Sequence, residues 1–438
     1  MPLMSNDGGE PDRSVVSGRL SDALEISGAW LSRIDLRALM KRQLFESGVL
    51  GGDGVVDVVA IGKASIEMAR AVASLLGDRV TRRLIVASEL ANGDEGASVN
   101  ANVVIGEHPI PGAKSVAAGE RLVDFLGAST NAELTVFLLS GGASSMCALP
   151  QAPLGISDLG AIWDAALMTG VDITTLNRAR AATSSIAGGA VLHHVRTRYV
   201  LTLIMVDNVI SGARWVGSGL TFSYHPRGAQ MTSLIDQLGL SGGELAQRMM
   251  ASFDARSALM ERPISCQVEN RVVVDPGALL DEVALDARRL GYRVVSMGAD
   301  VHGDVGDVAD RFATTIRREV ASDGPLCVVG VGEATVQVSG GGKGGRCQEL
   351  AWLMASRLAS IDCDADFLAT ASDGRDYVEG VAGAWVDRST MERLATLGVD
   401  WSEVAEHHDS FRGLESLGQI VAGRATGWNL CDIYLALA

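Results

Sequence analysis

The chain has 438 residues, of which 47% are hydrophobic, and its formal net charge is −16. A negative field over the whole molecule repels polyanions, so nucleic acid and acidic membrane surfaces are not expected as partners. No uninterrupted apolar run reaches the roughly 18 residues of a membrane-spanning helix. The cysteines are scattered without CxxC spacing, which indicates reduced thiols in a cytoplasmic protein.

The N-terminal half alternates between apolar runs of strand length and segments of helical periodicity. Such alternation is typical of a parallel sheet covered by helices, and the unbroken apolar runs indicate burial on both faces. Residues 1–20 are polar, lack the apolar segment of a signal peptide, and are expected to form a disordered tail. In chain order, strands are expected at 55–62, 83–88, 102–108, 134–142 and 198–207.

The C-terminal half follows a helical region over 228–262 and returns to the same alternation, and a docked helix is expected over 428–438. We place the domain boundary in the helical region, with an N-terminal α/β domain over 21–262 and a smaller α/β domain over 263–438. Both domains are expected to contain largely parallel sheets. Further strands are expected at 270–275, 292–300, 325–333 and 366–376.

Two turns of the N-terminal half offer groups that could bind an anion. Lys63 follows the first strand at a helix start, where an anion is favoured, although an ordinary solvated lysine is the alternative. The turn after the strand at 134–139 offers N–H and hydroxyl donors, and its alternative is a tight turn with a helix cap. These donors belong to Ser140, Gly141, Gly142, Ser144 and Ser145.

Two aspartates lie at the ends of other strands. Asp207 ends a very apolar strand and is a candidate Mg²⁺ ligand or general base. Asp373 lies in an Asp-Gly turn after the strand at 366–371, where it could also bind the metal. Capping of the following turn is the alternative for Asp207, and an ordinary Asp-Gly turn is the alternative for Asp373.

The glycine-rich segment SGGGKGGRCQE at 339–349 is either a flexible surface loop or a phosphate cradle. Its candidate nucleotide-binding residues are Lys343, Gly344, Gly345 and Arg346. Glycine-rich turns, separated cations and strand-end carboxylates together are what phosphoryl transfer requires. The residues alone therefore indicate an anion-binding α/β enzyme, with a phosphotransferase as the sharper hypothesis.

Several co-linear motifs resemble the glycerate 2-kinase family of the MOFRL type, some members of which are labelled hydroxypyruvate reductases. The most specific of them is the GGRxQEL element. The motifs are AIGKASIEMARA (60–71), GEHPIPGAKSVAAGERL (106–122), LLSGGASSM (138–146), NRARAATSSIAGG (177–189), GGRCQELA (344–351), ASDGRDYVEGVAGAWVD (371–387) and GWNLCDIYLAL (427–437).

The resemblance implies a Rossmann-like N-terminal domain, a smaller C-terminal domain and an active site in the cleft between them. It implies ATP and Mg²⁺ as cofactors and a small hydroxyl compound as substrate. Lys63 and Arg346 correspond to family residues thought to act on the phosphate groups. Asp207 and Asp373 correspond to family aspartates, and the substrate-binding residues would be Asn177, Arg180, Ser184 and Asp373.

The chain departs from the family pattern in the segment that would hold the acceptor. Where the family has lysine, histidine and a later lysine, this chain has Ala181, Ala182 and Ala187, and two acids after Asp207 become Ser211 and Gly212. Because glycerate is a small carboxylate, losing charge-assisted contacts would weaken its binding. We therefore expect an altered acceptor, such as a sugar, a cyclitol or a nucleoside-like metabolite.

The main hypothesis is thus an ATP-dependent kinase with Lys63, Arg346 and Asp207 as catalytic residues. The alternatives are a genuine D-glycerate 2-kinase and a non-catalytic relative that binds a nucleotide or metabolite. A hydroxypyruvate reductase comes last, because no GxGxxG follows a strand with an acidic residue further on. The sequence leaves open whether the protein is a monomer or a homodimer.

Overall fold

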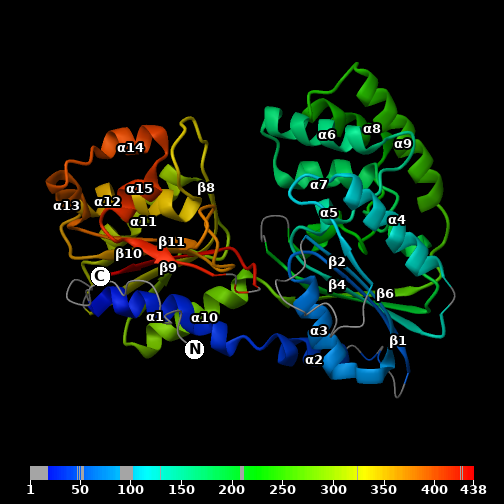
Figure 1. Ribbon diagram of the computed structural model, residues 1–438, viewed down its shortest axis with the longest axis horizontal. Coiled ribbons are helices and arrows are strands. Elements are labelled where there is room, and N and C mark those ends of the chain that lie inside the picture. The colour runs from blue at the N-terminus through cyan, green and yellow to red at the C-terminus, as the bar shows by residue number, and fades with distance from the viewer. Residues whose placement is uncertain are drawn as a thin grey trace. The chain divides into compact units, whose positions relative to one another are not determined.

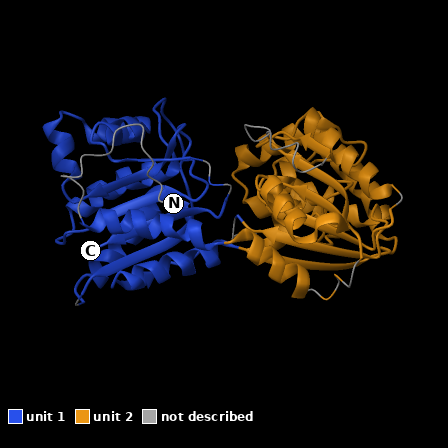
Figure 2. Cartoon of the chain, turned by 60° about the horizontal axis from the view of Figure 1, so that its bottom comes forward, with its two compact units in different colours: residues 1–34, 207–209, 275–438 blue, residues 35–206, 210–274 orange. Residues whose placement is uncertain are grey.

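The computed structural model describes residues 18–46, 48, 50, 54–88, 102–128, 130–207, 212–322, 324–424, 426 and 428–438. The chain divides into two compact units (Figure 2), and within the described residues one unit holds a six-stranded sheet and the other a seven-stranded sheet. The six-stranded unit comprises residues 35–206 and 210–274. The seven-stranded unit comprises residues 1–34, 207–209 and 275–438.

The sheet of the six-stranded unit is parallel throughout, in the order β3-β2-β1-β4-β5-β6. All residues of β1 and β4 are buried, as their unbroken apolar sequences predict. The strands are β1 Val56–Ile61, β2 Val80–Ala87, β3 Asn102–Ile105, β4 Leu134–Leu139, β5 Tyr199–Met205 and β6 Gln267–Val274.

Two groups of helices belong to the six-stranded unit, as Figure 1 shows. One group packs on the sheet, and the other forms a layer with an apolar core of its own that includes Ile162, Leu176, Met231 and Met249. The helices on the sheet include α3 Ser65–Leu76, α4 Ala113–Gly127 and α5 Ala143–Met146, with α2 Leu36–Glu46 packed on α3. The second layer consists of α6 Ile156–Thr169, α7 Ile173–Ala182, α8 Gly228–Gln237 and α9 Glu244–Met260.

The sheet of the seven-stranded unit is mixed, in the order β12-β11-β10-β13-β9-β7, with β8 also paired to β9. The pairs from β12 to β9 are antiparallel, and β7 and β8 run parallel to β9. The strands are β7 Arg293–Ser296, β8 Val301–Asp304, β9 Leu326–Thr335, β10 Asp366–Ala371, β11 Val381–Asp387, β12 Ile420–Ala422 and β13 Asp432–Leu437.

Helices lie on both faces of the seven-stranded sheet (Figure 1). Two of them contact the sheet on one face, namely α1 Gly18–Arg33 and α10 Pro276–Arg289. The other face is covered by α11 Val305–Glu319 and α12 Arg346–Ala359. Three short helices complete the unit, namely α13 Thr390–Thr396, α14 Trp401–His407 and α15 Ser410–Glu415.

The α/β class is confirmed, but two predictions for the second half are wrong. The seven-stranded sheet is not largely parallel, because burial of a strand on both faces, which the apolar runs indicate, does not fix the direction of its neighbours. The C-terminal segment is a strand, β13, and not a helix. Its short apolar run lies buried between β10 and β9, and periodicity alone does not separate such a strand from a buried helix.

The two units also differ from the predicted ranges 21–262 and 263–438. Strand β6 follows the helical region but pairs with β5, and α1 packs against α10 and β13, so both chain segments join the sheet that their apolar faces contact. Of the predicted tail, residues 1–17 lie outside the described residues, and residues 18–20 begin α1.

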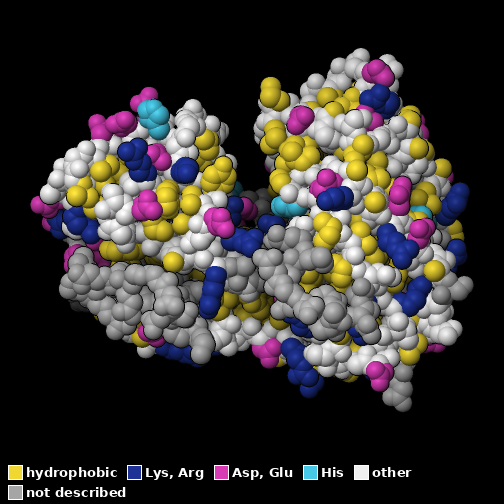
Figure 3. All heavy atoms as spheres, in the orientation of Figure 1, with side chains coloured by type: hydrophobic (Ala, Val, Ile, Leu, Met, Phe, Trp, Pro, Cys, Tyr) yellow, Lys and Arg dark blue, Asp and Glu magenta, His cyan; other side chains and the backbone are white. Residues whose placement is uncertain are grey.

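The structure bears on the expectations for the cysteines, for membrane-spanning helices and for the surface charge. All the cysteines are free, and only Cys363 is not fully buried. Among the described residues, no helix combines the length and the apolar character that crossing a membrane requires. On the face drawn in Figure 3, the acidic and basic side chains of the described residues are interspersed over both units and form no continuous basic patch.

Candidate active site

The turn after β1 and the turn after β4 lie against each other at the carboxyl edge of the six-stranded sheet. The backbone N–H of Lys63 donates to Gly141 O (2.9 Å), and the N–H of Ala64 donates to Ser140 Oγ (3.0 Å). Gly62 has φ +124°, and a Cβ there would lie 2.4 Å from Ser140 Oγ, so the two turns meet only with glycine at this position. The structure thus brings Lys63 and the predicted donor turn together.

The short helix α5 begins at Gly142, which has the left-handed φ of 81°. A Cβ on Gly142 would lie 2.8 Å from Cδ2 of His108, so glycine also lets the imidazole approach the helix start. Ser145 is tied to this turn, because its hydroxyl donates to Gly142 O (3.0 Å). Ser144 Oγ instead lies within hydrogen-bonding distance of Ser218 Oγ (2.8 Å).

His108 is a candidate functional residue that the sequence reasoning missed. It belongs to the loop between β3 and α4, which is fixed where Glu107 accepts from the N–H of Lys114 (2.9 Å). Desolvation and the neighbouring charges of Lys63 and Arg180 lower the pKa of His108 to about 4, so its imidazole is neutral at physiological pH. Its position inside the GEHPIPG motif was the available signal.

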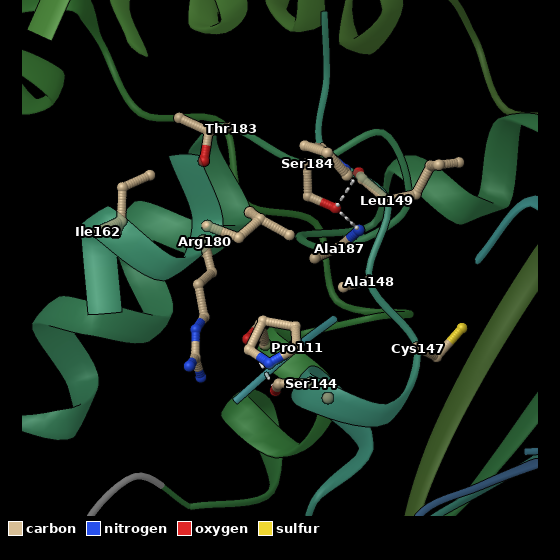
Figure 4. Close-up of a pocket in the computed structure, with 14 residues that line it drawn as sticks. Pro111, Ser144, Cys147, Ala148, Leu149, Ile162, Arg180, Thr183, Ser184 and Ala187 are labelled. Carbon is tan, nitrogen blue, oxygen red and sulfur yellow. Dashed lines mark hydrogen bonds between the residues drawn. The ribbon is translucent and has the colours of Figure 1, made fainter. Parts of the chain in front are cut away.

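A pocket lies beside this turn, between α7 and the segment that follows α5 (Figure 4). Arg180 and several hydroxyl groups face a space that is otherwise bordered by small and apolar side chains. The lining residues are Pro111, Ser144, Cys147, Ala148, Leu149, Pro150, Leu159, Ile162, Arg180, Thr183, Ser184, Ala187, Gly217 and Ser218.

Arg180 is the cation of this pocket. Its guanidinium lies over the ring of Trp163, 4.9 Å from the centroid, and within the described residues its buried Nη2 has no hydrogen-bond acceptor. Burial lowers the pKa of Arg180 to about 10, which still leaves it charged at neutral pH. A partly buried cation without a protein acceptor is suited to hold an anion.

Two other predicted substrate-binding residues act on the pocket in different ways. Ser184 lines it, and its Oγ accepts from the N–H groups of Ile186 (3.2 Å) and Ala187 (3.1 Å), which shapes the turn after α7. Asn177 is buried and does not line the pocket. Its Oδ1 accepts from Ser218 Oγ (3.1 Å), so Asn177 supports a lining hydroxyl.

The three alanines that replace family cations do not share one environment. Ala187 lines the pocket, whereas Ala181 and Ala182 are fully buried. Ala182 belongs to the apolar core of the α6–α9 layer, and Ala181 lies against Gly188. Only one of the three positions therefore borders the pocket.

The candidate residues of the seven-stranded unit centre on Arg346, the first residue of α12. Its Nε lies 2.5 Å from Asp432 Oδ2, its Nη2 3.1 Å from Asp432 Oδ1, and its Nη1 2.5 Å from Glu333 Oε1. Burial alone would lower the pKa of Arg346, but the charges of both carboxylates and the hydrogen bond to Asp432 raise it above its usual range. A guanidinium has more N–H donors than these three bonds use, so Arg346 can still bind an oxyanion.

Asp207 and Asp373 both lie against the segment that leads into β13. Asn429 Nδ2 is 3.5 Å from Asp207 Oδ2, and the backbone O of Asp373 accepts from Thr426 N (3.2 Å). Asp373 Oδ1 also accepts from the N–H of Arg375 (2.9 Å). A bond of this kind is typical of the ordinary Asp-Gly turn that is the alternative for Asp373. Among the described residues, no group of three metal-ligating side chains occurs.

The glycine-rich segment 339–345 packs closely on residues 407–410. A Cβ on Gly340 or Gly342 would lie 2.5 Å from backbone atoms of His407, and one on Gly344 would lie 2.2 Å from Ser410 Oγ. The N–H groups of Gly342 and Lys343 donate to His407 O and to Asp409 Oδ1 (2.9 Å each). These two N–H groups are therefore engaged within the protein, and close packing explains the glycines at least as directly as a phosphate cradle does.

The start of α12 is capped by Asp376, which belongs to the same predicted turn as Asp373. Asp376 accepts from the N–H groups of Cys347 (3.2 Å) and Gln348 (2.9 Å) and thus caps the helix from a distant loop. A Cβ on Gly345 would lie 2.2 Å from its carboxylate. Burial and the nearby Asp432 raise the pKa of Asp376 to about 6.

Two family models match the chain. One is described as a domain of unknown function (DUF4147) and matches residues 22–254, and the other is the MOFRL family and matches residues 326–432. The glycerate 2-kinase of Pyrococcus horikoshii is 28% identical over 396 residues, which cover 88% of this chain and 87% of the relative. The D-glycerate 2-kinase of Thermotoga maritima is 26% identical over 388 residues, with 87% and 90% covered.

The fold is that of a solved relative. The crystal structure of glycerate kinase from Thermotoga maritima matches with a TM-score of 0.80 at 24% sequence identity, over 95% of this chain and 98% of that one. Fold and sequence matches together define a kinase that transfers phosphate to an alcohol group. The chain belongs to the glycerate 2-kinase family, with its DUF4147 and MOFRL domains, which confirms the resemblance carried by the motifs.

Proposed function

We propose that this chain is an ATP-dependent glycerate 2-kinase. An altered acceptor was expected from the three alanines, but the relatives are glycerate kinases and favour the genuine activity. The burial of Ala181 and Ala182 also weakens the argument for that expectation, because these two positions are tightly packed and do not line the pocket. The altered acceptor is therefore not supported over glycerate.

The observation that carries the proposal is the buried Nη2 of Arg180, which has no acceptor among the described residues and belongs to a pocket with serine hydroxyls. Glycerate has a carboxylate and two hydroxyl groups, so one charge-assisted bond and several neutral ones would hold it. We assign the carboxylate to Arg180 and a hydroxyl group to Ser144, which lines the same pocket. A charge-assisted hydrogen bond of this kind contributes about 1.5–3 kcal/mol.

The phosphate groups of ATP are assigned to the neighbouring donors. Lys63 follows β1 beside the turn 140–142, and its exposed ammonium could neutralise charge on the transferring phosphoryl group. Neutral His108 would accept the hydrogen of a substrate hydroxyl. On the seven-stranded unit, Arg346 is assigned to phosphate through the N–H groups that its carboxylate partners leave over. The roles of Gly344, Gly345 and Lys343 in nucleotide binding stay predictions.

Asp207 and Asp373 are the residues that the sequence proposed for Mg²⁺. Mg²⁺ is commonly held by one or two carboxylates together with substrate phosphates and water, and Asp207 and Asp373 flank the same backbone segment. We propose that these two aspartates hold the ion. When bound, it would neutralise charge on the phosphate oxygens.

The proposal is tested by measuring ADP release with ATP, Mg²⁺ and a panel of acceptors. The panel contains D-glycerate, L-glycerate, glycerol and myo-inositol, and the product is identified by ³¹P NMR as the 2- or 3-phosphate. We expect turnover of D-glycerate with phosphate on the 2-hydroxyl and little with uncharged acceptors. Preferred turnover of myo-inositol or glycerol would restore the altered-acceptor hypothesis.

The same assay separates the remaining alternatives. Absence of transfer to every acceptor, with ATP still bound, would support a non-catalytic relative. Oxidation of NADH or NADPH by hydroxypyruvate would support a reductase. The matched variants are Arg180→Met and Arg178→Met, because both arginines lie on α7 but Arg178 is exposed and does not line the pocket.

A further inference from the structure

A second arginine lies beneath the same pocket and is fully buried. Arg256, on α9, has a relative exposure of 0%. Its Nε donates to Ser184 O (3.1 Å), and its Nη2 lies within hydrogen-bonding distance of the backbone oxygens of Ala187 (3.2 Å), Gly188 (2.9 Å) and Tyr224 (3.1 Å). The side chain thus collects four carbonyl groups, which lie in two segments that are distant in sequence from α9.

These carbonyls belong to the wall of the pocket. Ser184 and Ala187 line it, and the turn that contains them continues into Gly188, which has φ +59°. A Cβ on Gly188 would lie 2.6 Å from Arg256 Nη2, so the turn and the arginine fit together only with glycine there. A second anchor comes from the same helix, where Ser252 Oγ donates to Thr183 O (3.3 Å).

The charge of Arg256 has no carboxylate to balance it in the described part of the chain. Its buried Nη1 has no acceptor there either, and burial lowers the pKa of Arg256 to about 10, so the group is still charged at neutral pH. A buried cation is costly unless an opposite charge or strong dipoles compensate it. The carbonyl dipoles compensate in part, and an anion in the adjacent pocket would complete the compensation.

We propose that Arg256 is the positioning residue of this pocket. Its guanidinium holds the turn 184–188 in the shape that places Ser184, and its charge makes the pocket select a small anion over a neutral molecule of the same size. The inference rests on the proposed glycerate kinase activity for the identity of that anion. It also accounts for a cationic pocket in a chain that has alanine at 181, 182 and 187.

The experiment compares Arg256→Met with Arg248→Met in the full-length protein. Arg248 is the control because it lies on the same helix, α9, but its guanidinium pairs with Asp158 and Glu244 near the surface. KM and kcat are measured separately for D-glycerate and ATP, and thermal unfolding is recorded for both variants. For Arg256→Met we expect KM for D-glycerate to rise at least about tenfold while KM for ATP stays within about twofold. Arg248→Met should leave both KM values near those of the wild type.

An unchanged KM for D-glycerate in folded Arg256→Met would overturn the proposal, and so would an equal rise of both KM values. If Arg256→Met does not fold, Arg256→Lys is measured instead, because lysine keeps the positive charge. The preference for D-glycerate over its uncharged methyl ester should then stay within about threefold of the wild type. A loss of that preference in Arg256→Lys would show that the charge does not set it.

A binding measurement separates this inference from the proposed function. If the wild type does not phosphorylate D-glycerate, the kinase proposal fails, and calorimetric titration with glycolate is used instead. The inference then requires that the wild type bind glycolate and that Arg256→Met bind it at least about tenfold more weakly. If Arg256→Met does not fold, Arg256→Lys should keep the preference for glycolate over its methyl ester within about threefold of the wild type. Equal binding, or no binding by the wild type, would refute it.

Discussion

The arginines of the candidate sites differ between the two units in whether a carboxylate binds them. In the six-stranded unit, Arg180 and Arg256 are buried or half-buried without a carboxylate partner among the described residues. In the seven-stranded unit, Arg346 is bound by Asp432 and Glu333. A cation that the fold leaves unpaired is suited to an anionic ligand, whereas a paired one first of all stabilises its own unit.

The glycine-rich turns of the two units also differ in what their glycines allow to pack together. Around Gly62 and Gly142, glycine allows two strand ends and the His108 ring to meet beside the pocket. In the segment 339–345, glycine allows the backbone to pack on residues 407–410, and part of its N–H donors are already used. Glycine content alone therefore does not identify a phosphate-binding loop.

The largest expected effect is the loss of stability in Arg346→Met. It leaves Asp432, whose side chain is only 1% exposed, without its cation, and removing one partner of a buried pair costs about 3 kcal/mol or more. Urea unfolding followed by circular dichroism measures the loss. Asp432→Asn combined with Arg346→Met should recover part of it. An unchanged midpoint in the single variant would show that the pair contributes nothing to the fold.

Arg180→Met should instead weaken ligand binding without lowering the stability of the protein. Its guanidinium has no carboxylate to leave behind, so the free energy of unfolding should stay the same or rise slightly. Binding of D-glycerate should weaken by about 2 kcal/mol, or about thirtyfold, because one charge-assisted bond is lost. Isothermal titration with Arg178→Met as the control measures the difference. A destabilised protein with unchanged glycerate affinity would contradict the assignment.

Two helix-capping aspartates, one in each unit, should change the stability of the protein with pH in opposite directions. Asp376 caps α12 with a pKa raised to about 6 by burial and Asp432, so the native state keeps a proton that the unfolded chain loses near 3.8. Its contribution to stability therefore falls as pH rises from about 4 to 6. Asp172 caps α7. Desolvation opposes the shift, but its hydrogen bonds with Thr175 and Thr174 together lower its pKa, so its contribution is lost as pH falls through that lowered value.

Unfolding curves at a series of pH values measure these slopes in Asp376→Asn and Asp172→Asn. Asp376→Asn should remove the fall in stability between about pH 4 and 6, and Asp172→Asn should leave that fall in place. If both variants kept the wild-type profile, Asp376 would not titrate in this range.

The smallest effect concerns His108. Its imidazole should titrate near pH 4 in the free protein, since desolvation and the charges of Lys63 and Arg180 oppose protonation. Bound glycerate should raise the pKa of His108, because an anion offsets those charges. NMR titration of the imidazole protons with and without D-glycerate measures both values, and Arg180→Met should raise the pKa of the free protein. A ligand-free titration near 6.5 would place His108 away from these cations.

Much of the fold follows from local pattern. The parallel sheet at 56–205 was predicted because long apolar strands alternate with helices, and most strand positions agree with the structure. The misassigned β13 and the mixed second sheet show the limit of that reasoning. A short apolar segment carries no information about the direction of its neighbours or about which sheet it joins, since those depend on contacts with strands distant in sequence.

The candidate site also combines features that the sequence predicts with features that depend on tertiary contacts. The sequence by itself determined which residues end strands and start helices, and therefore selected Lys63, the turn 140–145 and Arg346, whereas Arg180 was selected by its place in a family motif. The tertiary structure decided which charges are paired. Asp432 and Glu333 reach Arg346 only through the pairing of β9 with β13, and Arg256 reaches the pocket only because α9 packs beneath the turn 184–188. Pairing depends on distances in space that residue type and spacing along the chain do not specify.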